Sequence, residues 1–339
     1  MALKAEASAR RKETAPPATL YIGGGTPTLY PAADLACLVS LITALQPKGQ
    51  PLEEITVEAN PSDITTEYCR TLRRAGVTRL SLGIQSFNDE LLGFMGRRHR
   101  STQALEAYHA AAAVFDNLSI DLIFGFPHLT QQVWEQTLSA AVALKPAHIS
   151  AYQLSLEGDC VWGKLLAEGK LALPAEEDSA AQYTLLQQML TGAGYLQYEI
   201  SNFCLPGFES RHNSAYWQRV PYTGLGPGAH SFNGTDRFWN VCNVKRYIEE
   251  IRDKGIPPRR YDRLNPTEAA SEQVMLSLRT TQGLDTALYR NLWGARRTDR
   301  LLRAAAPLVQ EGRLRVQGNY LKINPPQYFV ADSLIRELF

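Results

Sequence analysis

Residues that can do chemistry stand at the ends of five short apolar segments in the first half of the chain. They are the Gly23-Gly24-Gly25-Thr26 run, Glu58, Gln85 with Arg97 a short segment later, Asp121, and Ser155. Two carboxylates within apolar segments are costly to bury without partners. Glycine and polar groups repeated at the segment ends therefore indicate one shared ligand, and the set suits a ligand that carries an amine, a ribose and a carboxylate.

Each member of this set also has a purely structural interpretation. The glycine run can be a tight turn, Glu58 and Asp121 can be carboxylates held by backbone amides, and Gln85 can tie down a loop. The glycine run is not a Rossmann fingerprint, because Pro27 and the following residues separate it from the next helix pattern. The five segment ends taken together favour a binding site more than any single one does.

The segments between these residues alternate as the strands and helices of an α/β fold do. Strands are expected at residues 19–22, 55–58, 80–84, 119–124 and 148–154. Helices are expected after Pro31, over residues 68–75 with Gly76 at the end, and after the caps Ser101 and Thr130. This repeat predicts a doubly wound sheet or a (β/α) barrel, with the working residues where strands meet loops.

The rhythm changes after residue 171. A helix over residues 178–191 precedes a zone rich in proline and glycine, in which we expect His212 to lie in a loop. Helices after Asn265 lead to a hairpin, with strands at 314–316 and 320–323. The helices and hairpin resemble a winged helix, but the arginines before the hairpin are better explained as a solvated helix face than as a DNA-binding surface.

Composition excludes several classes of function. The 339 residues are 45% hydrophobic and 20% charged with a net charge of +1, which indicates neither a nucleic-acid surface nor a membrane surface. No apolar run approaches membrane-spanning length and no secretory signal is indicated, so we expect a cytoplasmic protein. The five cysteines are scattered, and none forms a Cys-x-x-Cys pair: Cys37, Cys69, Cys160, Cys204 and Cys242.

Seven segments resemble the coproporphyrinogen-oxidase-like branch of the radical S-adenosylmethionine (SAM) proteins. They are YIGGGTPT (21–28), ITVEANP (55–61), RLSLGIQSF (79–87), SIDLIFGFP (119–127), QYEISNF (197–203), RHNSAYW (211–217) and YTGLGPGAHS (222–231). The His-Asn-x-x-Tyr-Trp segment favours the HemW-type heme-chaperone subgroup over the oxygen-independent coproporphyrinogen III dehydrogenases.

The resemblance implies a partial (β/α)6 TIM-like barrel that lacks its first βα unit, followed by a C-terminal α+β domain with a winged-helix-like end. It divides the chain into a helix remnant (1–17), the barrel (18–173) and the C-terminal domain (174–339). It also assigns SAM to the strand ends. Gly24, Gly25 and Thr26 would meet the methionine amino group, Glu58, Gln85 and Asp121 the amino and ribose groups, Arg97 the carboxylate, and Ser155 the adenosyl group.

The chain departs from the family's pattern at its start. The family places a Cys-x-x-x-Cys-x-x-Cys loop before the glycine run, and the three thiolates hold a [4Fe–4S] cluster that chelates SAM. The sequence contains no such loop. We therefore expect no radical activity from the chain as written and weak binding of SAM. A start codon assigned too far downstream and a genuine loss both explain this difference.

The heme-chaperone resemblance implies a heme site and transfer of heme to acceptor proteins. The candidate iron ligands are His212, Tyr216 and His230, and Arg211 or Arg219 would pair with propionates. Both histidines can instead be structural. Two other functions stay open: a coproporphyrinogen III dehydrogenase, which would need the cluster, and a non-catalytic scaffold that has lost its chemistry.

Overall fold

The computed structural model describes residues 1–339 except 12, 14–15, 48 and 157–160. Its contacts divide the chain into two compact units. The sheet unit comprises Tyr21–Leu35 and Ile55–Glu209, and the C-terminal unit comprises Met1–Leu20, Ala36–Glu54 and Ser210–Phe339. The strands β1 and β2 contain two of the points at which the chain passes from one unit to the other.

A seven-stranded sheet has the order β1-β2-β3-β4-β5-β7-β6. Its strands are β1 (Thr19–Ile22), β2 (Glu54–Ala59), β3 (Arg79–Gln85), β4 (Leu118–Phe124), β5 (His148–Gln153), β6 (Leu196–Gln197) and β7 (Asn202–Cys204). The β2, β3, β4 and β5 strands pair in parallel, whereas β7 runs antiparallel to β5. All five predicted strands are confirmed. The sheet also continues past residue 174, through β6 and β7.

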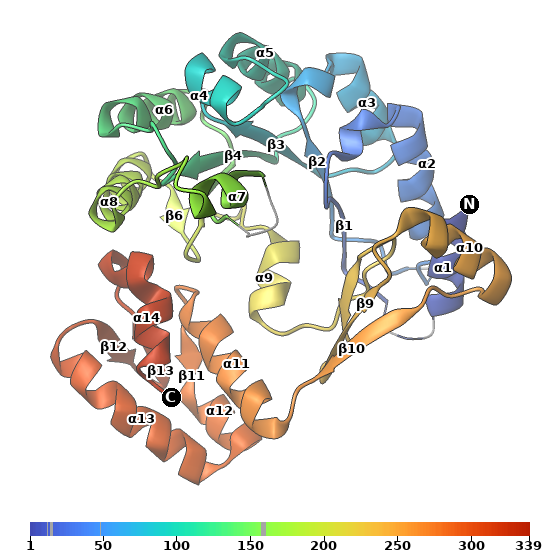
Figure 1. Ribbon diagram of the computed structural model, residues 1–339. Helices are drawn as coiled ribbons and strands as arrows, with labels where there is room; N and C mark the ends of the chain where they lie inside the picture. Colours follow the sequence, from blue (N-terminus) through green and yellow to red (C-terminus); the bar gives the residue numbers. More distant parts are fainter. Residues whose placement is uncertain (12, 14–15, 48, 157–160) are drawn as a thin grey trace. The chain divides into compact units, whose positions relative to one another are not determined.

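Helices alternate with the strands of the sheet unit, and most of them cover the outer side of its sheet (Figure 1). They are α3 (Thr66–Arg74), α4 (Asp89–Phe94), α5 (Ser101–Ala112), α6 (Gln131–Leu144), α7 (Val161–Ala167) and α8 (Glu176–Gly192), with the 3-10 turns η1 (Pro27–Leu29) and η2 (Pro61–Asp63); α2 (Ala32–Thr43) belongs partly to each unit. Thr130 caps α6 by accepting from Val133 N–H, as predicted. Ser101 does not cap α5 but is its first residue, and its N–H donates to Asp89.

The two faces of the sheet differ in polarity because alternate residues of a strand point to opposite faces. The apolar face carries fully buried side chains such as Val57, Leu80 and Ile120. The other face is polar: Glu58 lies opposite Ser81, and Asp121 lies opposite Ser150. The carboxylates thus belong to a polar surface inside the curved sheet rather than to isolated positions in an apolar strand.

The C-terminal unit contains two three-stranded sheets, β10-β9-β8 and β11-β13-β12. Its strands are β8 (His230–Phe232), β9 (Asp236–Asn240), β10 (Arg259–Arg263), β11 (Leu284–Asp285), β12 (Leu314–Gln317) and β13 (Tyr320–Ile323). Its helices are α1 (Ala2–Arg10), α9 (Arg211–Trp217), α10 (Val244–Lys254), α11 (Pro266–Leu278), α12 (Thr286–Trp293), α13 (Ala295–Gln310), η3 (Pro325–Val330) and α14 (Ala331–Arg336). The predicted hairpin is confirmed as β12–β13.

The first helix of the chain is fixed to the C-terminal unit by two buried charges. Glu6 is fully buried and accepts from Gly226 N–H, Asn240 Nδ2 and Tyr247 Oη at 2.9, 2.7 and 2.6 Å. Arg10 lies one turn later, 3.3 Å from the Glu6 carboxylate. Burial of an ion pair is tolerated when additional hydrogen bonds satisfy both charges. Helix α1 is therefore an integral part of this unit.

Among the described helices, none is both long enough and apolar enough to cross a membrane.

Candidate functional site

The Glu58 carboxylate on β2 connects the first two strand ends. It accepts a 2.7 Å hydrogen bond from Tyr21 Oη on β1 and a 3.3 Å hydrogen bond from Gly24 N–H. A Cβ atom on Gly23 would lie 2.7 Å from this carboxylate, so glycine is required for the close approach of the turn. Gly24 has a φ of 82°, which is the left-handed region that favours glycine. The glycine run and Glu58 thus form one structural element.

Asp121 lies on the same polar face, at the adjoining part of the sheet. Ser81 Oγ on β3 donates to it at 3.1 Å, and Ser150 on β5 donates to it as well. Burial raises the pKa of Asp121 to about 6, and the Glu58 charge adds to this effect, whereas Arg79 and the two serines oppose it. A positively charged ligand group beside Asp121 would relieve the cost of its ionisation.

Gln85 ends β3 in a strained conformation. Its φ is 68°, and its residue is 8% exposed. The pairing of β3 with β4 shifts register between Leu82 and Gln85, which is an irregularity of the kind that re-aims a side chain. A non-glycine residue at positive φ costs free energy and persists mainly where the surroundings or the function require it.

Two consecutive arginines after β3 have different partners. Arg98 makes a bidentate ion pair with Asp63, with distances of 3.0 and 2.8 Å. Arg97 is half-buried and forms no ion pair within the described part of the chain. Burial lowers the pKa of Arg97, and the charge of Asp121 opposes that shift. Arg97 is therefore the member of the pair that is able to take a ligand carboxylate.

Thr26 and Ser155 are less firmly connected to this group. Thr26 is half-buried at the start of η1, and Ser155 is exposed two residues after β5. Neither side chain forms a hydrogen bond with another described residue. Glu58, Gln85, Arg97 and Asp121 together offer two anions, an amide and a cation. This combination matches a ligand with both an ammonium and a carboxylate, as in an amino acid.

The cysteines do not form a cluster site in the described residues. Cys69 and Cys204 are buried, which raises the pKa of Cys69 to about 11 and that of Cys204 to about 12. Cys37 and Cys242 are exposed, and Cys160 lies outside the described residues. No group of three metal-ligating side chains occurs in the ranges that the structure describes. These residues do not fit a [4Fe–4S] cluster.

His212 lies in a helix, and the prediction that it lies in a loop is wrong. It is the second residue of α9, whose first turn is capped by Ser210. The buried Glu54 carboxylate accepts from the N–H groups of Arg211 and His212, both at 3.0 Å. These charge-assisted bonds satisfy helix donors that would otherwise be unpaired. Glu54 therefore fixes the position of α9.

Both ring nitrogens of His212 form contacts. Nδ1 lies 2.8 Å from Thr19 Oγ1, and Nε2 lies 2.8 Å from Tyr216 Oη one helical turn later.

The other predicted heme-binding residues lie elsewhere in the C-terminal unit. His230 is exposed on β8, and its ring stacks on that of Trp239 with 5.4 Å between the ring centroids. Of the two arginines predicted to pair with propionates, Arg211 makes an exposed ion pair with Glu53. Arg219 lines a cavity next to α9.

Sequence reasoning missed several polar partners of these residues. Tyr21, Ser81 and Ser150 hold the carboxylates, and Glu54 and Thr19 hold α9 and His212. The strand partners could have been found from alternation, because Ser81 and Ser150 stand at the same parity as the neighbouring polar residues of their strands. The contacts of Thr19 and Glu54 with α9 join residues far apart in sequence and leave no local signal.

Comparisons with known proteins show the family of the chain. The model of the radical SAM superfamily matches residues 3–141, and that of the HemN C-terminal domain matches residues 264–328. The chain is 38% identical over 277 residues to the heme chaperone HemW of Bacillus subtilis, which covers 81% of this chain and 73% of that protein. It is 34% identical over 344 residues to the heme chaperone HemW of Mycobacterium tuberculosis, which covers 100% of this chain and 85% of that protein.

Among solved structures, the coproporphyrinogen III oxidase HemN of Escherichia coli, a radical SAM enzyme, matches with a TM-score of 0.82. The match covers 99% of this chain and 81% of that one at 23% identity, and therefore bears on the fold alone. It confirms the predicted TIM-like fold with an additional C-terminal domain. Because the HemW proteins match over most of their own length, the chain belongs to the HemW family of the radical SAM superfamily.

Proposed function

We propose that this protein binds heme as cargo through His212 and passes it to acceptor proteins in the cytoplasm, as a HemW-like heme chaperone. The names of its relatives support heme as the cargo. The single structural observation that carries the proposal is the anchored position of His212, on a helix whose first turn is fixed by Glu54. The ordinary composition supports the cytoplasmic location.

The surroundings of His212 suit an iron ligand. Histidines that bind metals usually hydrogen-bond through their second ring nitrogen, which fixes the orientation of the ring. The contact between Nδ1 and Thr19 Oγ1 is such a hydrogen bond, and Nε2 contacts the Tyr216 hydroxyl. The iron would take the place of the Tyr216 hydroxyl at Nε2. This exchange costs one hydrogen bond, which is worth about 1 kcal/mol.

Tyr216 is the weaker ligand candidate. Burial raises the pKa of Tyr216 to about 12, and this disfavours the phenolate that would bind iron. His230 presents an exposed ring stacked on Trp239, and no described hydrogen bond orients its nitrogens. His212 is thus the preferred ligand among the three predicted residues.

We further propose that the strand ends of the sheet unit bind SAM. Glu58 and Asp121 would receive its amino and ribose groups, Gln85 would assist them, and Arg97 would pair with its carboxylate. Gly24 and Gly25 would let the backbone approach the ligand, with Thr26 and Ser155 at the periphery. The strained Gln85 and the steric restriction at Gly23 support this assignment. The cysteines described above offer no anchor for the cluster, so no radical step is assigned.

A heme titration followed by the Soret absorbance band tests the heme proposal. One heme per chain should bind, and His212→Ala should weaken binding at least tenfold, which corresponds to about 1.4 kcal/mol. His109→Ala is the matched control, because His109 is an exposed histidine on α5. Turnover of coproporphyrinogen III is measured in parallel with SAM and a reductant. Turnover, or heme affinity unchanged in His212→Ala, would contradict the proposal.

A further inference from the structure

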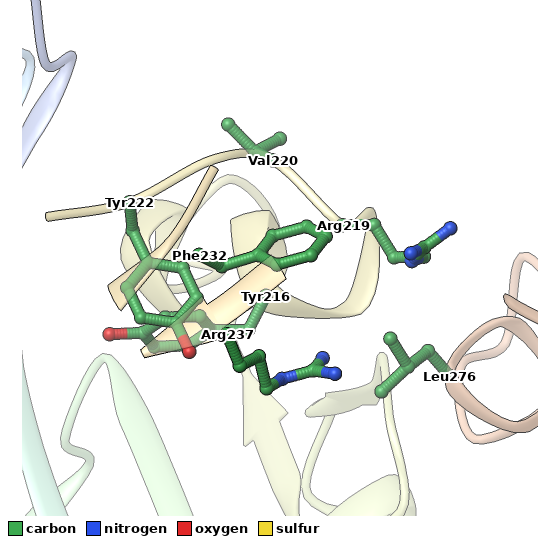
Figure 2. A pocket seen from close by; sticks show the side chains of 7 residues that line it. All are labelled: Tyr216, Arg219, Val220, Tyr222, Phe232, Arg237 and Leu276. Atoms are coloured by element: carbon green, nitrogen blue, oxygen red, sulfur yellow. The ribbon is translucent and has the colours of Figure 1, made fainter. Parts of the chain in front are cut away.

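A cavity of about 270 Å³ lies within the C-terminal unit, beside the end of α9 (Figure 2). It is lined by aromatic, cationic and aliphatic side chains: Tyr216, Tyr222, Phe232, Arg219, Arg237, Val220 and Leu276. Pockets that enclose a complete drug-sized ligand measure roughly 300 to 1,000 Å³. The cavity is therefore sized for one substituent of a ligand rather than for a whole tetrapyrrole.

Two cations share one anion at this cavity. Glu272 on α11 is paired with Arg219 Nε at 2.9 Å and with Arg237 Nη1, and its side chain is 12% exposed. Both guanidinium groups also lie over the Phe232 ring, at 5.3 and 5.1 Å from its centroid. Arg237 also forms a side-chain hydrogen bond with Tyr222. One positive charge is thus not balanced by Glu272.

Arg219 carries two further signs of a binding residue. Its Nη2 atom is buried and has no hydrogen-bond partner among the residues that the structure describes. Its φ is 55°, in the left-handed region that non-glycine residues rarely adopt. A buried unpaired donor costs about 1 to 3 kcal/mol, and a ligand acceptor would remove that cost. A planar guanidinium that keeps a free edge is suited to a carboxylate.

We propose that this cavity binds a carboxylate through Arg219 and Arg237. The inference rests on the proposed heme function, under which the carboxylate is a propionate of the tetrapyrrole bound at His212. Tyr216 joins the two places, because its hydroxyl contacts His212 Nε2 and its ring packs edge-on against Tyr222 at 4.7 Å between centroids. The cavity would thus select tetrapyrroles that carry a free propionate and would orient them on α9.

The first experiment compares heme with its dimethyl ester, in which the propionate charges are removed. The wild-type chain should bind heme at least tenfold more tightly than the ester, as expected for loss of a charged hydrogen bond. Arg219→Gln should weaken heme binding to the level of the ester and leave ester binding unchanged. Arg246→Gln, at an exposed arginine on α10, is the matched control and should change neither affinity.

A second variant separates binding from a structural role. Glu272→Gln removes the competing anion without removing either arginine, so heme should bind several-fold more tightly and the ester should not. A purely structural ion pair predicts the opposite result, because the two guanidinium groups would lose their buried partner. Equal weakening of heme and ester in Arg219→Gln, together with weaker heme binding in Glu272→Gln, would overturn the proposal.

A heme-independent measurement distinguishes failure of this inference from failure of the proposed function. Sodium benzoate should raise the Tm of the wild-type chain, whereas benzamide, which lacks the charge, should not, and Arg219→Gln should abolish the benzoate shift. Benzoate stabilisation without any heme binding would refute the heme function and with it the propionate assignment. Heme binding with no preference over the ester and no benzoate shift would refute the cavity alone.

Discussion

The Arg98 guanidinium and the Asp63 carboxylate form a bidentate ion pair, with hydrogen bonds of 3.0 and 2.8 Å. The adjacent Arg97 forms no ion pair in the described part of the chain. The structure thus gives these two adjacent arginines different partners. One stabilises the loop after β3, and the other is able to meet a ligand.

Replacement of Arg97 should affect the binding of SAM selectively. Arg97→Gln should weaken binding about tenfold to a hundredfold, since a hydrogen bond to a charged group contributes about 1.5 to 3 kcal/mol. Ligand-observed NMR detects the weak binding expected without a cluster. Arg98→Gln is the matched control and should leave the affinity unchanged. Wild type and Arg97→Gln should bind decarboxylated SAM with the same affinity. A lower affinity of Arg97→Gln for this ligand would show that Arg97 does not pair with the carboxylate.

Asp121 should make stability depend on pH. Its pKa is raised to about 6 in the folded state, from 3.8 ordinarily, so the folded chain binds this proton more tightly than the unfolded chain. Stability therefore falls as the pH rises between about 4 and 6, by roughly 1.4 kcal/mol for each unit of pKa difference. Asp121→Asn should be more stable than wild type above about pH 6. This advantage should disappear below about pH 4. Urea unfolding of both proteins at several pH values measures the free energy of unfolding.

Asp116→Asn is the control for this titration, because Asp116 is exposed just before β4. This variant retains Asp121 and should therefore show the same fall in stability between about pH 4 and 6 as wild type. An Asp121→Asn variant with the same pH profile as wild type would show that Asp121 is not destabilised by burial.

Replacement of Tyr216 by phenylalanine distinguishes the two candidate heme ligands on α9, His212 and Tyr216. Tyr216→Phe removes the hydrogen bond to His212 Nε2, which the iron must displace in any case. Heme should therefore bind at least as tightly to this variant, with an unchanged Soret maximum. A loss of affinity similar to that of His212→Ala would instead indicate Tyr216 as the ligand.

The buried charges of α1 should dominate the stability of the C-terminal unit. Glu6→Ala leaves the Arg10 charge buried without this partner, and removal of one member of a buried pair costs about 3 to 5 kcal/mol. Lys4→Ala changes an exposed residue of the same helix and should cost less than about 0.5 kcal/mol. Thermal unfolding measures both. A similar Tm for the two variants would mean that α1 does not contribute to the folded unit.

The strands and most helix ends follow from local signals in the sequence. Short apolar segments rich in strand-forming residues predicted β1 to β5. Thr130 and Gly76 predicted helix ends, because capping depends on neighbouring residues. The partners of Asp121 were also predictable. Alternate residues of a strand share one face of the sheet, and this alternation places Ser81 and Ser150 on the face that carries Asp121.

Tertiary contacts account for the remaining differences. The helix α9 has only seven residues, too few to be stable alone, and it forms where Glu54 and Ser210 satisfy its first N–H groups. The proline and glycine residues near this segment are a local signal for a loop, and they predicted one here because the contact with Glu54 is not visible in the local sequence. The burial of Glu6 and the sharing of Glu272 by two arginines likewise depend on partners far away in the chain, which no local pattern indicates.

The coordination of the ferric heme complex tests the central claim most directly. With ¹⁵N-labelled histidine, pulsed electron paramagnetic resonance should show one strong nitrogen coupling from an axial imidazole in the wild-type chain and in His230→Ala, and His212→Ala should lack it. A coupling that survives in His212→Ala but disappears in His230→Ala would contradict the assignment of heme to α9.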